Sequence, residues 1–262
     1  MDNTSALLQF LAAKSKSFQS EFEDLLDWVS DVIEIQGTIG FNEAALAKLP
    51  QDDRDLVVTY VALMNGMDTT LLGLLHMLGA GLVSDGYALA RTLFESYVVM
   101  AYGNREALEG APDCRTHVVD VLGRGVGPAD KQGHREQELV RVARHRLLEG
   151  HPAEKQLREL LRFINNFGSH LSRAKILGGN STSKNGRLVS AAAIMDHTDG
   201  HLLRCLSTAS ILFLSANVEY FRALSVASGN PLPQTSPFDQ LEQRYMQHIE
   251  PGLRERFASR VR

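Results

Sequence analysis

A charged pair in an apolar segment is the first feature of this sequence that could do chemistry. Arg91 and Glu95 stand four residues apart, which places both on one face of a helix. The residues around them in the segment 85–98 are mostly apolar. Charges in such surroundings need each other or further hydrogen bonds, so we expect a partly buried pair. It is either a structural ion pair that ties this helix to its neighbours, or a pocket in which Arg91 holds an anionic ligand and Glu95 orients it.

A second polar group lies about seventy residues further along the chain, in the segment 162–170. Asn165 and Ser169 are four residues apart, as are Asn166 and His170, so their side chains gather on one side of a helix. Histidine exchanges protons near neutral pH, which makes His170 a candidate general base. The alternative is a histidine satisfied by local hydrogen bonds at a helix kink. We expect the three other side chains to contact the same ligand as Arg91.

Together these two segments carry a resemblance to a known family. The pattern L-x-x-G-x-x-x-x-G-Y-x-L-x-R-x-L-x-E, followed by an aromatic-Ser-His segment, is similar to uncharacterised bacterial proteins of the HEPN-like superfamily. It is made by Leu78, Gly81, Gly86, Tyr87, Leu89, Arg91, Leu93 and Glu95, and then by Phe167, Ser169 and His170. The resemblance covers about residues 55–225. It implies an antiparallel helical bundle that is often dimeric.

The same resemblance implies an activity on RNA or on nucleotides. Some members of the superfamily are metal-independent ribonucleases in toxin or defence systems, and others only bind nucleotides or partner proteins. The nuclease members use an arginine and a histidine separated by four to six residues. His170 matches the histidine, whereas Arg162 lies one position outside this spacing. Arg146 and His151 have the spacing but straddle a predicted helix end.

A basic run at 134–146 adds candidate phosphate contacts. Arg141, Arg144 and His145 fall near one helix face, as in a stripe that follows a nucleic-acid backbone. The alternative is a solvated helix face, since glutamates at 136 and 138 dilute the charge. The charge is also uneven over the whole chain. Residues 1–110 hold 16 acidic and 6 basic residues, whereas 111–262 hold 15 acidic and 21 basic.

Composition and motifs exclude several other classes of protein. The 262 residues are 44% hydrophobic and 22% charged, which is typical of a globular chain rather than of disorder or collagen. Two distant cysteines, Cys114 and Cys205, make no disulfide scaffold, and we expect a cytoplasmic protein. The segment 196–201 has two histidines at metal-ligand spacing, but a helix start capped by aspartate explains it more simply. There is no Gly-rich phosphate loop and no G-x-S-x-G elbow, and we expect no cofactor and no metal.

The elements that must position these residues are helices. Apolar spacing, glycines and prolines predict helices over 5–35, 42–49, 53–78, 85–102, 114–122, 134–148, 154–167 and 199–227, with caps at Asp52 or Asp53 and at Ser84 or Asp85. A last helix opens at Ser236-Pro237, and GGNSTSKNGR at 178–187 predicts a long loop. The uncharged stretches 69–84 and 205–218 fall short of the roughly 18 apolar residues that a membrane span needs. We therefore expect an all-α, antiparallel helical bundle over 1–228, with a linker and helical C-terminal appendage over 229–262, and no membrane partner.

The resemblance, together with these polar and basic residues, implies a bacterial stress or defence protein that binds RNA or a nucleotide and that forms a homodimer. Arg91, Glu95, Asn166 and His170 would then line one pocket. The alternative is a non-enzymatic module for protein–protein interaction or self-association, in which the acidic first part and the basic second part meet a partner, another copy or each other.

Overall fold

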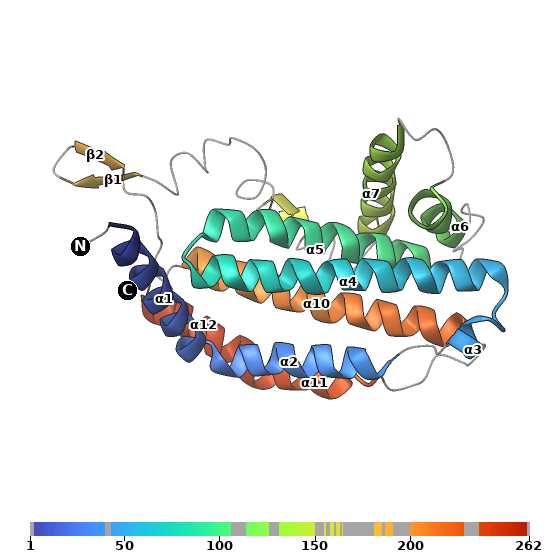
Figure 1. Ribbon diagram of the computed structural model, residues 1–262, viewed down its shortest axis with the longest axis horizontal. Coiled ribbons are helices and arrows are strands. Elements are labelled where there is room, and N and C mark those ends of the chain that lie inside the picture. Colours follow the sequence, from blue (N-terminus) through green and yellow to red (C-terminus); the bar gives the residue numbers. More distant parts are fainter. Residues whose placement is uncertain are drawn as a thin grey trace.

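The computed structural model shows an all-α helical bundle (Figure 1). It describes residues 3–39, 43–105, 114–125, 131–149, 200–227 and 236–260, the short segments 181–184 and 187–190, and isolated positions between 155 and 164. The helices in these segments are α1 (Asn3–Glu21), α2 (Glu23–Thr38), α3 (Glu43–Leu46), α4 (Gln51–Gly79), α5 (Val83–Asn104), α6 (Cys114–Val118), α7 (Gln132–Leu148), α10 (Gly200–Ala227), α11 (Asp239–Arg244) and α12 (Glu250–Arg260), with π-helical turns η1 (Val119–Gly123) and η3 (Tyr245–Ile249). The fold class expected from the sequence is confirmed.

Three long helices, α4, α5 and α10, pack side by side and form the centre of the bundle (Figure 1). Their apolar residues recur at helical spacing, so each helix turns a continuous apolar stripe toward the other two. Leu71, Leu93 and Phe213 are among the side chains that are completely buried there. The chain reverses between α4 and α5 at Gly81, whose φ of 80° lies in the left-handed region that favours glycine. The glycines near position 80 therefore separate two antiparallel helices, as their spacing predicts.

The C-terminal helices are packed into the bundle against α2. The indole Nε1 of Trp28 donates a hydrogen bond of 2.8 Å to the carbonyl of Leu241, and the Trp28 and Tyr245 rings lie 4.9 Å apart. Arg256 donates to the Glu21 carbonyl and stands over the Phe22 ring. The expected C-terminal appendage is thus helical, and its apolar face completes the core.

A smaller group of helices covers the far part of α5. In Figure 1, α7 stands at a steep angle to α5 with one end against it, and α6 lies beside it. Leu139, Ala143 and Leu148 form the buried side of α7. Gln132, at its start, donates a hydrogen bond of 2.7 Å to the Val121 carbonyl in η1. These contacts hold the basic face of α7 beside α5.

Several helix ends differ from the sequence expectation. The helix expected over 5–35 is broken at Phe22, whose buried ring packs against Phe18 while its backbone leaves the helical conformation (φ −115°, ψ 24°). The α4 helix begins at Gln51, with Pro50 in the capping position, so Asp52 and Asp53 lie in its first turn instead of capping it. The α5 helix likewise begins at Val83, before both of its expected caps. Ion pairs made elsewhere occupy the Asp52 and Asp53 carboxylates.

The segment expected as a loop over 178–187 contains part of a hairpin. Strands β1 (Ser181–Lys184) and β2 (Arg187–Ser190) pair antiparallel, with Ser181 opposite Ser190 and Lys184 opposite Arg187. The strand 187–190 has two consecutive apolar residues between two polar ones, with no alternation to mark it, and the glycine-rich flanks favoured a loop in the sequence. Of the helix expected over 154–167, the positions that the structure describes are helical, and the others lie outside the described residues.

Two of the described helices, α4 and α10, are long and apolar enough to cross a membrane by length and composition alone. Both are longer than the uncharged stretches of the sequence suggested, because they continue through isolated charged or polar residues. The apolar stretch of α10 is 67% buried inside the bundle, as expected for a core helix. That of α4 is only 39% buried.

Candidate functional site

A cleft of about 740 Å³ between α5 and α7 brings together charged residues that the sequence analysis singled out separately. Arg91 and Glu95 line it from α5, and Arg141 and Arg144 line it from α7. The first pair was expected to hold an anion and the second to contact phosphates. Because α7 packs against α5 at this point, side chains about fifty residues apart in the sequence share one cleft.

Arg91 and Glu95 form the ion pair that their spacing predicts. Nε of Arg91 donates to Oε1 of Glu95 over 2.8 Å, and the two side chains are 37% and 35% exposed. The bond stays within α5, so among the described residues this pair does not tie α5 to a neighbouring helix. The carboxylate instead holds the guanidinium at the wall of the cleft, with its remaining N–H groups available to a ligand.

The arginines of α7 differ in their partners. Arg141 pairs with Glu138 one turn before it, and this hydrogen bond from the guanidinium lowers the pKa of the Glu138 carboxyl. Among the described residues Arg144 has no ion-pair partner, although it is half-buried. His145 does not line the cleft. Its side chain is 71% exposed, and its Nδ1 lies 3.6 Å from Glu149.

Part of the cleft lining is apolar. Leu63 of α4, Leu122 of η1 and Val140 of α7 are partly exposed there, whereas Val99 and Leu139 belong to the buried core. The lining is therefore mixed, with charged and polar side chains more numerous than apolar ones. Its chemistry fits a ligand that carries an anionic group beside an apolar part.

The other sequence candidates lie outside the described residues. This holds for Asn165, Asn166, Ser169 and His170, so the pocket expected to join Arg91 with His170 stays a prediction. The side chains of the two histidines in the segment 196–201 also lie outside the described part of the structure. Within the described part of the chain, no group of three or more His, Cys, Asp and Glu residues is arranged to hold a metal ion.

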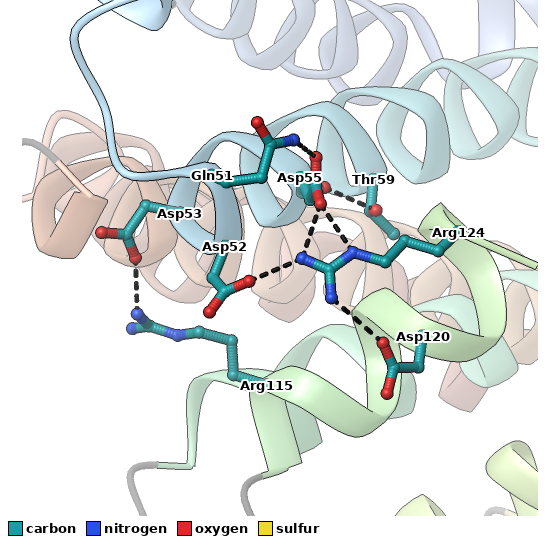
Figure 2. A network of polar contacts seen from close by, with 8 residues as sticks. All are labelled: Gln51, Asp52, Asp53, Asp55, Thr59, Arg115, Asp120 and Arg124. Carbon is teal, nitrogen blue, oxygen red and sulfur yellow. Dashed lines mark hydrogen bonds and ion pairs between the residues drawn. The ribbon is translucent and has the colours of Figure 1, made fainter. Parts of the chain in front are cut away.

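The structure also shows a charged network that the sequence analysis missed, at the start of α4 (Figure 2). Arg124, just after η1, donates to Asp52 over 2.5 Å and to Asp55 over 2.7 Å, and it reaches Asp120 at 3.3 Å. Beside it, Arg115 of α6 pairs with Asp53 over 2.7 Å. The hydrogen bonds to the two α4 carboxylates raise the pKa of Arg124.

This network is a clamp between helices and not a ligand site, because its groups already satisfy one another. Nε, Nη1 and Nη2 of Arg124 all donate to carboxylates, and Asp55 also accepts a bond of 2.6 Å from Gln51 (Figure 2). Gly123 lies so close to Thr59 that a Cβ there would meet the hydroxyl. The run of acids at 52–55 was the available signal in the sequence, but its arginine partners lie more than sixty residues away.

A half-buried histidine, His117 of α6, contacts Tyr102 of α5. The hydroxyl of Tyr102 lies 3.2 Å from Nδ1 of His117, and the two rings meet edge to face. Burial, together with the charge of Arg135, lowers the pKa of His117, and this outweighs the opposing effect of Asp120 and Glu138. We expect a neutral imidazole here at pH 7, which accepts the tyrosine hydroxyl at Nδ1.

Comparison with known proteins adds no assignment to this geometry. No protein-family model, no curated protein and no solved structure matches the chain. The resemblance to HEPN-like proteins therefore stays a prediction.

Proposed function

We propose that the α5–α7 cleft binds the phosphate groups of RNA or of a nucleotide. The observation that carries the proposal is the convergence of Arg91, Arg141 and Arg144, from two helices, on one cleft. Guanidinium groups bind phosphate oxygens through charge-assisted hydrogen bonds that are about twice as strong as neutral ones. The resemblance to HEPN-like proteins, some of which act on RNA or bind nucleotides, agrees with this ligand class.

Two of the arginines already have carboxylate partners, and each keeps further N–H groups with which to bind a phosphate. Arg91 is held by Glu95 and Arg141 by Glu138, so each of these two cations has a carboxylate partner within its own helix. An arriving phosphate takes their free N–H groups and meets Arg144 as the arginine without a described partner. The nearby carboxylates limit retention of simple anions, because part of each guanidinium is already satisfied.

The apolar part of the lining favours a ligand with a base over a bare inorganic anion. Leu63, Leu122 and Val140 are the partly exposed apolar side chains of the cleft lining, and a nucleobase packed against them would lose contact with water. Glu95 and Gln137, at the rim, supply hydrogen-bonding groups suited to ribose hydroxyls or base edges. A nucleotide unit with its phosphate toward α7 thus matches both parts of the cleft.

The proposal is tested with two probes, a fluorescein-labelled single-stranded RNA of twenty nucleotides and ATP. For three phosphate contacts to single-stranded RNA, we expect affinity to fall roughly 20-fold between 50 and 200 mM salt. Replacing Arg144 with alanine removes one contact, so Arg144→Ala weakens RNA binding about tenfold and flattens the salt dependence. Fluorescence anisotropy measures both effects. Competition with ATP shows whether a single nucleotide suffices.

Arg254→Ala is the matched control. Arg254 is an exposed arginine on α12, paired with Glu250 on its own helix, and it lies outside the cleft. We expect this variant to bind both probes like the wild-type protein. If Arg141→Ala and Arg144→Ala bind as tightly as Arg254→Ala, or if the wild-type protein binds neither probe, the proposal is wrong.

The proposal is that the cleft binds RNA or a nucleotide, with no claim that it cleaves RNA. A cleavage assay tests for that additional activity. The labelled RNA is incubated without metal ions with wild-type protein, with His170→Ala and with Arg144→Ala. Cleavage that both substitutions abolish would add a ribonuclease activity to the binding function. Cleavage that His170→Ala leaves intact would reject His170 as a general base.

A further inference from the structure

The outer side of α4 is an apolar helix face that no described element covers. Val58 and Leu72 are 54% and 57% exposed on it, and Val61 is 37% exposed. Exposed small or uncharged residues fill the face between them, namely Ala62, Asn65, Gly66 and Thr69. We call the face from Val58 to Leu72 the α4 stripe. Less than half of this apolar stretch of α4 is buried, whereas the corresponding stretch of α10 is mostly buried.

Gly66 is unexplained by the fold of a single chain. It lies in the middle of a helix of 29 residues, where glycine costs about 1 kcal/mol relative to alanine. A Cβ added at Gly66 would meet nothing within 4 Å, so no neighbour in the bundle requires the glycine. Glycine at an exposed helix position lets another backbone approach closely. The residue therefore fits a helix that packs across the α4 stripe from outside.

The stripe also offers no polar group that a partner would have to satisfy, apart from one amide. The hydroxyl of Thr69 donates to the Asn65 carbonyl over 3.0 Å, and its methyl group is left to face outward. No residue on the stripe is charged. The nearest carboxylate, Asp68, is half-buried and accepts a hydrogen bond from Gln36. Burying such a surface needs little desolvation of polar groups.

The order of residues along the stripe indicates which partner it fits. Val58 and Leu72 each stand seven residues from Asn65, and Val61 and Thr69 each stand four. Two copies of α4 that cross antiparallel at Asn65 therefore place Val58 opposite the partner's Leu72. A two-fold interface requires this kind of self-complementary patch. Antiparallel alignment also sets the helix dipoles in their favourable order.

We propose that this chain forms a two-fold dimer through the α4 stripe, with Gly66 at the closest approach and the two Asn65 amides paired across the axis. A buried pair of asparagine amides satisfies itself and fixes the register of two helices. A lipid surface is a poorer occupant. Helices that lie on membranes carry lysine and arginine on their polar side, whereas α4 carries Asp52, Asp53 and Asp55 with a single arginine.

The full chain is tested by analytical ultracentrifugation between 1 and 100 μM. We expect the wild-type protein to have twice the 28.9 kDa mass of the chain at the upper concentrations. Leu72→Asp places two carboxylates in the interface and shifts the dissociation constant upward at least tenfold. Leu72 is more than half exposed, so this variant keeps its helical circular dichroism. Met246→Asp, on η3, is the control, because Met246 is equally exposed outside the stripe and leaves the dimer intact.

A cross-link tests the register independently of dimer strength. Asn65→Cys should form a disulfide between two chains under mild oxidation, because residue 65 lies on the two-fold axis. Both natural cysteines, Cys114 and Cys205, are buried and do not compete. Met246→Cys should stay uncross-linked. A monomeric wild-type protein, or a dimer that Leu72→Asp does not weaken and Asn65→Cys does not cross-link, would overturn the proposal. So would a monomer that binds phosphatidylglycerol vesicles through Leu72, since the stripe would then serve lipid.

Discussion

At the scale of single residues, the described site depends on which polar groups already have partners. Arg124 and Arg144 are both arginines near the α7 end of the bundle, yet their environments are opposite. Arg124 donates to three carboxylates and has little left to offer a ligand. Arg144 lines a cleft and has no ion-pair partner among the described residues. Arg124 is therefore structural and Arg144 is a candidate ligand contact, because they differ in how many of their N–H groups already have acceptors and not in residue type.

His117 makes stability depend on pH in a direction that follows from its environment. Burial and Arg135 lower its pKa below the ordinary value of 6.5, so the unfolded chain binds a proton before the folded protein does. The contribution of His117 to stability is therefore complete above pH 6.5 and decreases as the pH falls below 6.5 toward the folded pKa. We expect the free energy of unfolding to be lower at pH 5.5 than at pH 7.5. Urea denaturation at the two pH values measures the difference.

His117→Gln is the variant that isolates this contribution. Glutamine retains a group that can accept the Tyr102 hydroxyl but does not titrate. The difference in stability between the two pH values should therefore shrink in His117→Gln. An unchanged difference would assign the pH dependence to other groups.

At the scale of elements, the contact between α4 and α5 depends on a glycine at a close approach. A Cβ on Gly103 would collide with the hydroxyl of Tyr60 and lie 3.2 Å from Val118. Tyr60 is fully buried and donates a hydrogen bond of 2.6 Å to the Met100 carbonyl, so its ring has no space into which to retreat. Gly103→Ala should therefore destabilise the protein by about 1–3 kcal/mol, through overpacking and loss of this bond.

Gly37→Ala is the control for that substitution. Gly37 lies in α2, and a Cβ there would meet nothing within 4 Å. Alanine has the higher helix propensity, so we expect this variant to be as stable as the wild type or up to about 1 kcal/mol more stable. Thermal unfolding followed by circular dichroism compares the two variants. Equal stability of Gly103→Ala and the wild type would mean that Tyr60 moves aside at little cost.

Element positions were predictable where the local signal was strong. The helices around Val57–Leu78, His134–Leu148 and 199–227 have apolar residues at helical spacing, and the structure has α4, α7 and α10 there. Helix ends were less predictable. Asp52 and Asp53, for example, are of a residue type that often caps the start of a helix. The structure employs them in ion pairs with Arg115 and Arg124 instead. A cap signal is local, whereas the competing partner came from a distant helix.

At the scale of the whole molecule, the two ends of the chain stabilise each other. Trp28 and Leu241 are 213 residues apart in sequence and joined by a buried hydrogen bond. Trp28→Phe keeps an aromatic ring but leaves the Leu241 carbonyl without its donor. We expect the free energy of unfolding to fall by about 1–3 kcal/mol. Urea denaturation followed by circular dichroism measures it.

Met246→Ala is the comparison for the Trp28 variant. Met246 lies on η3, next to Tyr245, and its side chain is 55% exposed. A truncation there should change stability by no more than about 0.5 kcal/mol. If Trp28→Phe were equally harmless, the C-terminal helices would be held by packing alone.

The uneven charge of the chain is partly resolved within the molecule. Arg115, Arg124 and Arg244, from the basic second part, all pair with aspartates of the acidic first part. Of the alternatives that the sequence left open, contact between the two parts of one chain is therefore observed. Arg141 and Arg144 do not take part in these contacts between the two parts, and both line the cleft.

The amino-acid sequence alone determined the helical class, most helix positions and the pairing of Arg91 with Glu95. These properties depend on neighbours within one or two helical turns, so spacing and propensity are enough to predict them. Only the tertiary structure decided that α7 packs against α5 and brings Arg141 and Arg144 to the same cleft as Arg91. It also decided that Arg124 joins η1 to α4, and that α4 has an apolar face that no described element covers. Such contacts depend on how the shapes of distant helices fit together, and no local pattern records which face packs against which.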